Sequence, residues 1–301
     1  MGQEDMAYRS VVCVKQVPDT SNISGEVMKP DGTVNRAKLP AIFNPDDLVA
    51  LELALQVRDE YGGKVYVITM GPPPAAEVLR QALYMGADEV VLISDRRFAG
   101  ADTLATSYAL SMAIRKIGNV DLVFCGRQAI DGDTAQVGPQ LAEKLGVPQV
   151  TYVEKIEKIE GGWLHAKRRI DGGYERVRAT LPVLLTVFGD AAIPRPFNAK
   201  LMMEKKRARS RFELERMSGN NPLSFFYNDP GTLEKKGLLI FTWGVEDINA
   251  EEERCGLKGS PTQVYKVENV VLTSPERKRY EPTKADLEKL IDELMTDHIF
   301  G

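Results

Sequence analysis

Short apolar segments alternate with amphipathic stretches over the first half of the chain. The expected strands are residues 10–17, 64–69, 89–93 and 121–125, and the expected helices are residues 45–61, 75–85, 102–117 and 134–145. Strands that alternate with helices of about 10 to 15 residues form parallel sheets covered on both faces. The predicted fold class is therefore α/β, with a doubly wound, mainly parallel sheet.

Residues typical of helix ends delimit these segments. Asn44 and Pro45 suit the N-cap and the first position of a helix, and Gly62 suits its end. Asp102 is expected to cap the helix that reaches Ile117.

The alternation is interrupted in two places. Residues 18–40 are polar and rich in turn residues, which predicts a hairpin excursion over the sheet edge. From residue 149 to residue 187 the helices stop, and alternating segments separated by glycine pairs predict an antiparallel appendage.

Beyond residue 189 the chain changes character again, with a basic run at residues 205–211. We interpret this part as an extended arm, either solvated or wrapped on a partner, that ends in an amphipathic docking helix at residues 282–299 capped by Thr283. The predicted domains are thus residues 1–189, a nucleotide- or flavin-binding α/β domain with its antiparallel appendage, and residues 190–301, a partner-wrapping arm with its C-terminal helix.

Composition excludes several functional classes. The formal charge of −4 over 301 residues supplies no basic field for general nucleic-acid binding. The three cysteines form no CxxC pair, which disfavours a zinc ribbon or an iron–sulfur cluster, and only His165 and His298 are available for multi-histidine metal sites or triads. No apolar run is long enough to span a membrane. We expect a cytoplasmic protein with reduced thiols.

Three expected strand ends could bind a ligand, because ligands of doubly wound sheets lie beyond the carboxyl ends of the strands. They are residues 13–15, residues 70–71 and the loop at residues 126–139. Gly71 lacks a Cβ and lets a ligand approach the backbone. The G-x-G-x-x-G and P-loop fingerprints are absent, which disfavours a nicotinamide Rossmann site and a P-loop NTPase.

The loop at residues 126–139 runs into the N-terminus of an expected helix, where free N–H groups and the helix dipole suit a phosphate. Thr134 could cap this helix or donate to an anion, and Gly132 and Gly138 would keep the approach open. The alternative is a capped loop that binds nothing.

The loop also carries three charged residues that could contact a nucleotide. Asp131 and Asp133 repel phosphate, so we assign them to ribose hydroxyls or to capping. Arg127 could pair either with a cofactor phosphate or with a partner subunit.

Several motifs together carry a family resemblance. Residues 125–146, CGRQAIDGDTAQVGPQLAEKLG, resemble the nucleotide loop of electron-transfer flavoprotein (ETF) beta subunits, and residues 166–186 are similar to that family's signature. Further similar motifs follow the family's order at VCVK, NP, MGP and MGAD, which begin at residues 12, 44, 70 and 85. The resemblance covers about residues 10–190.

The resemblance implies a heterodimer with an alpha subunit that carries an electron-transferring FAD. Simple members hold a structural AMP in the beta subunit. Electron-bifurcating members hold there the ADP moiety of a second FAD that accepts hydride from NADH. Residues 132–139 and 256–262 look like the bifurcating, FixA-like version. We therefore interpret the chain as the beta subunit of a bifurcating ETF, which passes electrons to the alpha-subunit FAD and to a low-potential acceptor.

The residues that this resemblance and the strand ends together assign to the cofactor are Cys13, Val14, Lys15, Asn44, Pro45, Met70, Gly71, Gly126, Arg127, Gln128, Asp131, Gly132, Asp133, Thr134, Ala135, Gln136, Val137, Gly138 and Pro139. No catalytic side chain or metal ligand is expected, because the flavin carries the chemistry. NADH oxidation is expected only within a flavoprotein complex.

The family also implies further redox partners, such as a quinone oxidoreductase or an acyl-CoA dehydrogenase and a ferredoxin-like protein, through which the chain could associate with a membrane. Residues 192–198 lack the leucine of the recognition loop with which simple members dock on dehydrogenases. Two alternatives stay open: a non-bifurcating ETF beta subunit with AMP, and an adenine-nucleotide sensor of the universal-stress type.

Overall fold

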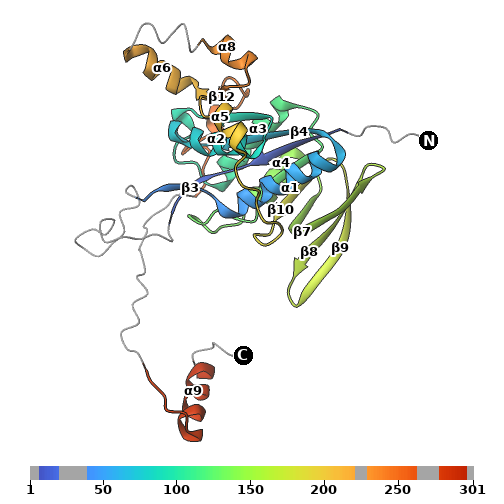
Figure 1. The fold of residues 1–301 in the computed structure, drawn as a ribbon, viewed down its shortest axis with the longest axis vertical. Helices are drawn as coiled ribbons and strands as arrows, with labels where there is room; N and C mark the ends of the chain where they lie inside the picture. The colour runs from blue at the N-terminus through green and yellow to red at the C-terminus, as the bar shows by residue number, and fades with distance from the viewer. Residues whose placement is uncertain (1–6, 20–38, 221–228, 263–277, 297–301) are drawn as a thin grey trace.

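The computed structural model describes residues 7–19, 39–220, 229–262 and 278–296 (Figure 1). Its strands are β1 (Tyr8–Cys13), β2 (Gln16–Pro18), β3 (Ala41–Phe43), β4 (Gly63–Met70), β5 (Glu89–Ile93), β6 (Leu122–Gly126), β7 (Gln149–Glu160), β8 (Trp163–Ile170), β9 (Gly173–Thr180), β10 (Val183–Val187), β11 (Arg209–Ser210) and β12 (Leu239–Trp243).

Its α-helices are α1 (Pro45–Tyr61), α2 (Ala76–Met85), α3 (Thr103–Ile117), α4 (Val137–Leu145), α5 (Ala199–Lys205), α6 (Arg211–Asn220), α8 (Pro230–Lys235) and α9 (Lys284–Thr296). Three short 3-10 helices are η3 (Pro73–Ala75), η4 (Arg96–Phe98) and η5 (Glu252–Arg254).

One sheet runs through the described part of the chain in the order β11-β12-β5-β4-β1-β6-β10-β7-β8-β9. The central strand β1 pairs in parallel with β4 on one side and with β6 on the other. Its successive side chains face different layers: Val12 packs with α1 and α2, and Val11 packs with α3 and α4. Two apolar cores, one on each face, confirm the doubly wound, mainly parallel fold.

The first predicted strand is divided in two. β1 ends at Cys13, and β2 turns away to pair with β3 in an antiparallel hairpin. The break occurs because the backbone N–H of Lys15 donates to the side chain of Asp47 instead of to a strand. The base of the predicted excursion is thus a hairpin, while residues 20–38 lie outside the described residues.

The predicted helix at residues 134–145 begins later, at Val137. Asp133 and Ala135 have φ angles of 48° and 53°, which no α-helix accommodates. Thr134 therefore belongs to the loop and does not cap α4.

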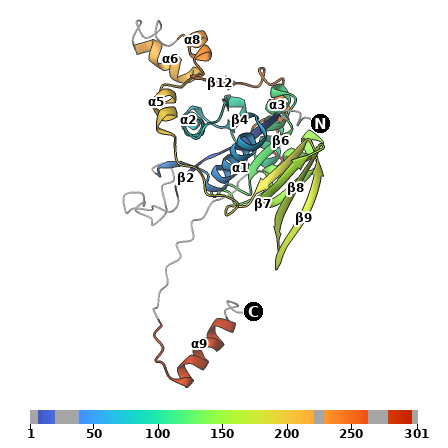
Figure 2. The same cartoon turned by 45° about the vertical axis from the view of Figure 1, so that its right-hand side comes forward.

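The antiparallel appendage consists of β7, β8 and β9, with glycine pairs in both turns as predicted. Figures 1 and 2 show these strands projecting from the end of the sheet opposite to α6 and α8. The prediction was wrong for residues 183–187: β10 pairs in parallel with both β6 and β7. All of its side chains are buried, as expected of a strand covered on both faces.

Residues beyond 189 also contribute to the sheet. β12 pairs in parallel with β5, and β11 pairs with β12. The sheet therefore includes strands from both predicted domains, and β12 contains Trp243, whose sequence context is strand-like. Its basic run at residues 205–211 includes β11 and the start of α6.

α9 lies apart from the sheet in both views (Figures 1 and 2). None of its residues is buried, and Leu287, Ile291 and Met295 are 49%, 50% and 58% exposed. The N–H of Asp286 donates to Oγ1 of Thr283 at 3.3 Å, which confirms the predicted cap. Within the described residues, no helix is long and apolar enough to cross a membrane.

Candidate functional site

The predicted cofactor site is built where the carboxyl ends of β1 and β6 meet the first turn of α1. Cys13 and Cys125 are in register on these neighbouring parallel strands, so both strands end at the same edge of the sheet. The loop that follows β6 runs from Arg127 to Gln136 and leads into α4.

Asn44 binds this loop instead of capping α1. Its Nδ2 donates to the carbonyl oxygen of Gln128 at 2.9 Å, and its Oδ1 accepts from the N–H of Ile130 at 3.1 Å. The side chain is buried and makes no capping hydrogen bond to α1. Asn44 occupies the predicted N-cap position, but its side-chain amide hydrogen-bonds the loop instead of the helix.

Asp47 joins the ends of two strands. One carboxylate oxygen accepts from the N–H of Lys15 at 2.8 Å, and the other accepts from the N–H of Gly126 at 3.1 Å. Burial raises the pKa of Asp47 to about 7, although these hydrogen bonds favour the ionised form. A Cβ on Gly126 would lie 2.4 Å from Oδ1 of Asp47, which explains the glycine.

Arg127 faces α1 and not the exposed part of the loop. Its Nε lies 3.5 Å from Oδ2 of Asp46, and its guanidinium lies 5.6 Å from the centre of the Phe188 ring. Burial raises the pKa of Asp46, and Arg127 partly offsets this shift. Arg127 thus forms an ion pair with Asp46, and its side chain stays one-third exposed.

The second half of the loop is open. Gly132, Asp133, Thr134 and Gln136 are exposed, and a Cβ on Gly132 would meet nothing within 4 Å. Gln136 occupies the N-cap position of α4 without a side-chain capping bond. Within the described residues, the N–H groups of Val137 and Gly138 in the first turn of α4 therefore have no side-chain cap, and Pro139 has no N–H. Free N–H groups at such a helix end suit an anion.

Both aspartates of the loop have partners. Lys15 forms an ion pair of 2.7 Å with Asp131, and Nε2 of Gln128 donates to Asp133 at 2.9 Å. The ammonium of Lys15 thus reaches from the end of β1 to the loop.

Gly138 is buried beneath the loop. A Cβ on this residue would lie 2.6 Å from Cγ2 of Thr186 in β10. Its lack of a side chain is needed for the close packing of α4 on the sheet.

Met70 and Gly71 line a separate cavity of about 1070 Å³ at the carboxyl ends of β4, β5 and β12. They are the only predicted site residues among its lining residues, which also include Ser94, Phe98 and Gly244. The structure thus brings residues 13–15, 44–45 and 126–139 together, while residues 70–71 face this second space.

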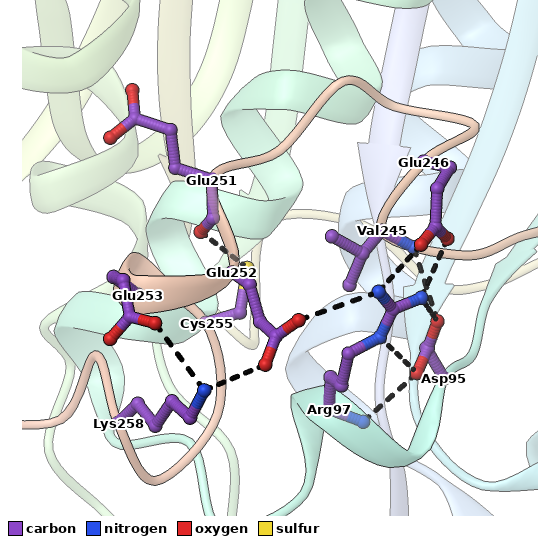
Figure 3. Close-up of polar contacts among 9 residues, drawn as sticks. All are labelled: Asp95, Arg97, Val245, Glu246, Glu251, Glu252, Glu253, Cys255 and Lys258. Carbon is purple, nitrogen blue, oxygen red and sulfur yellow. Dashed lines mark hydrogen bonds and ion pairs between the residues drawn. The ribbon is translucent and has the colours of Figure 1, made fainter.

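An ion-pair network fixes one wall of the cavity (Figure 3). Arg97 pairs with Asp95 and Glu246, at 2.6 Å each, and with Glu252 at 3.6 Å. The hydrogen bonds from Arg97 lower the pKa of Asp95 to about 2. Lys258 extends the network through Glu252 and Glu253.

The segment at residues 256–262 closes over the start of α3. Asp102 caps α3, as predicted, and its second oxygen accepts from Oγ1 of Thr262 at 2.7 Å. A Cβ on Gly256 would lie 2.0 Å from the carbonyl oxygen of Arg97, so this turn requires glycine.

Sequence reasoning missed Asp46, Asp47 and Arg97. Two aspartates after an Asn-Pro pair read as an ordinary acidic first turn of a helix. The sequence does not reveal that Asp46 and Asp47 are buried, because the strands that bury them are distant in sequence. For Arg97, the partner Glu246 follows 149 residues later.

Comparison with known proteins agrees with this architecture. Residues 31–215 match the electron transfer flavoprotein domain family. The electron transfer flavoprotein subunit beta of Clostridium acetobutylicum is 45% identical, over 85% of this chain and 86% of that protein.

Two further relatives cover most of both chains. The acryloyl-CoA reductase electron transfer subunit gamma of Anaerotignum propionicum is 44% identical, over 97% of this chain and 99% of that protein. Protein FixA of Bradyrhizobium diazoefficiens is 42% identical, over 86% of this chain and 81% of that protein. The chain therefore belongs to the electron transfer flavoprotein family, among its beta-subunit and FixA-type members.

Proposed function

We propose that this chain holds the ADP part of an FAD at residues 131–137 and at the N-terminus of α4. The observation that carries the proposal is the absence of a side-chain cap on α4 next to an exposed loop whose first half is fastened to α1. Backbone N–H groups there suit a diphosphate. Thr134 is exposed and can donate its hydroxyl to the same anion.

The remaining predicted residues fit the other parts of the nucleotide. Asp131 and Asp133 retain acceptor capacity for ribose hydroxyls beyond their bonds to Lys15 and Gln128. Lys15 is half-exposed and can exchange its partner Asp131 for a phosphate oxygen. Bound FAD would supply the redox chemistry, with NADH as the hydride donor, while these side chains bind and orient it.

The same contacts would serve AMP equally well, and this is the second candidate. We favour FAD because residues 132–139 and 256–262 resemble the bifurcating members of the family. Residues 256–262 contact Asp102 and Arg97. These contacts support a role for the extension next to the α/β fold.

The proposed assembly is a cytoplasmic heterodimer with an ETF alpha subunit. A relative named for acryloyl-CoA reductase supports further association with redox enzymes, which could include an acyl-CoA dehydrogenase, a quinone oxidoreductase or a ferredoxin-like protein. Any contact with a membrane would then come through those partners.

The test is acid extraction of cofactors from the co-purified heterodimer, with quantitation per dimer. We expect two FAD and no AMP, with reduction of the flavin on addition of NADH. One FAD with one AMP, and no reduction by NADH, would leave the simple ETF. A colourless homodimer that does not bind the alpha subunit would favour the nucleotide sensor.

A further inference from the structure

We propose that Asp47 is a positioning residue that fixes the conformation of residues 126–130. Residues 131–137 are then left to contact the nucleotide. The inference deepens the proposed function and rests on it for the identity of the ligand. The shape of the loop itself is a property of the protein without ligand.

The geometry places Asp47 between the two strand ends that flank the site. Its carboxylate accepts the N–H of Lys15 after β1 at 2.8 Å and the N–H of Gly126 at the end of β6 at 3.1 Å. These two N–H groups are 111 positions apart in the sequence (126 − 15), so neither strand alone sets their separation. One rigid helical side chain therefore fixes where both segments leave the sheet.

A carboxylate is the side chain that this position requires. Above its raised pKa of about 7, Asp47 is ionised and presents only acceptors, and both of its oxygens face backbone donors. An amide at the same place would turn an NH₂ group toward one of those N–H groups. The buried donor would then lose its partner, which is the costly outcome for a buried hydrogen bond.

Two neighbours of Asp47, Asn44 and Asp46, also bind residues of the loop. Asn44 binds Gln128 and Ile130, and Asp46 pairs with Arg127. Residues 126–130 are thus held by one turn of α1, and all of them are at most half-exposed. Residues 132, 133, 134 and 136, by contrast, are exposed.

Glu52 provides a matched control on the same helix. It is a buried carboxylate whose Oε2 accepts from the backbone N–H of Arg195 at 3.0 Å and from its Nε at 2.8 Å, while Oε1 accepts from its Nη2 at 3.1 Å. Glu52→Gln therefore also breaks a buried carboxylate contact of α1, but that contact is with the arm and not with the loop.

The first test is amide hydrogen exchange of the ligand-free full chain, co-purified with its alpha subunit and stripped of nucleotide. We expect Asp47→Asn and Asp47→Ala to raise the exchange rate of residues 126–130 at least about tenfold, because one buried donor–acceptor pair is lost. Glu52→Gln should leave these amides unchanged. Wild-type protection of residues 126–130 in both Asp47 variants would overturn the inference.

The variant Asn44→Ala provides a second test if the Asp47 variants do not fold. It keeps the two hydrogen bonds that Asp47 accepts from backbone N–H groups and removes the hydrogen bond between the Asn44 and Asp47 side chains. Faster exchange should therefore be greatest at Ile130, whose N–H donates to Asn44, while Gly126 stays protected. If Gly126 also lost protection in Asn44→Ala, Asp47 would not hold the strand end by itself, and the inference would fail.

The second test is calorimetric titration with ADP. We expect Asp47→Asn to weaken ADP binding about tenfold or more, and Glu52→Gln to change it less than about twofold. If wild type binds no ADP while the exchange results hold, the proposed function fails and the positioning role stands. Equal ADP affinity in wild type and Asp47→Asn would overturn the link between loop shape and binding.

Discussion

Asp47 carries a buried carboxyl group whose pKa is raised to about 7, while an unfolded chain would release that proton near pH 4. Between these values the folded protein holds more protons than the unfolded one, so the free energy of unfolding falls as pH rises. The loss is complete about one pH unit above the folded-state pKa of about 7. Asp46 has a shift in the same direction.

We therefore predict that the free energy of unfolding of the wild-type protein falls by about 2 kcal/mol between pH 5 and pH 7, out of about 4 kcal/mol over the full span of the Asp47 shift. Urea unfolding at pH 5, 6, 7 and 8 measures the slope, and Asp47→Asn removes the titrating group. An equal slope in wild type and variant would assign the pH dependence to other groups.

Gly132 in the loop and Gly138 in α4 lack a side chain for different reasons. A methyl group on Gly138 meets Thr186 at 2.6 Å, whereas one on Gly132 meets nothing. We predict that Gly138→Ala lowers the free energy of unfolding by about 1 to 3 kcal/mol, as overpacking does. Gly132→Ala should stay within about 0.5 kcal/mol of wild type. Equal stability of the two variants would contradict the close approach of α4 and β10.

At the scale of elements, the sequence predicted well wherever local signals suffice. The helices α1, α2 and α3 were placed within a residue or two because apolar spacing, Asp102 and the terminal glycines are local. The start of α4 was misplaced because Asp133 and Ala135 have positive φ angles, which residues other than glycine rarely adopt. The parallel pairing of β10 was missed since it is set by β6 and β7 together.

The sequence predicted which strand ends lie close together, but not which part of the loop is held by side chains and which part is exposed. The strand-end rule brought residues 13–15 and 126–139 together correctly. Nothing in the sequence marked residues 126–130 as fastened and residues 131–137 as open, because the fastening side chains belong to α1. The second cavity also escaped prediction, since β12 joins β5 from the far end of the chain.

The network around Arg97 connects three segments: the turn after β5, the turn after β12, and η5 (Figure 3). We predict that Arg97→Gln speeds amide exchange in residues 245–258 and leaves β1 and β6 unaffected. Raised salt should produce a weaker form of the same effect in wild type, because exposed ion pairs are screened. Unchanged exchange in residues 245–258 would show that backbone contacts alone hold the segment.

At the scale of the whole molecule, α9 presents an apolar face that no described part of the chain buries. We predict that deleting residues 278–301 leaves the urea midpoint of the remaining chain unchanged, because α9 adds nothing to the sheet. The same deletion should reduce recovery of the alpha subunit in co-purification.

The substitutions Leu287→Ser and Ile291→Ser serve as a finer version of that deletion, because they remove the apolar face while keeping the chain length. Full recovery of the alpha subunit with this double variant would place the partner contact elsewhere.

The position of β12 also has a consequence for biosynthesis. Val91 and Phe241 are directly paired although 150 residues separate them (241 − 91), so the edge of β5 stays open until most of the chain has left the ribosome. An open edge can pair with another chain, and contacts so distant in sequence close slowly. The nascent protein thus exposes this strand edge while the residues between β5 and β12 are synthesised, and we expect mispairing at the edge of β5 to be the main hazard of its folding during that interval.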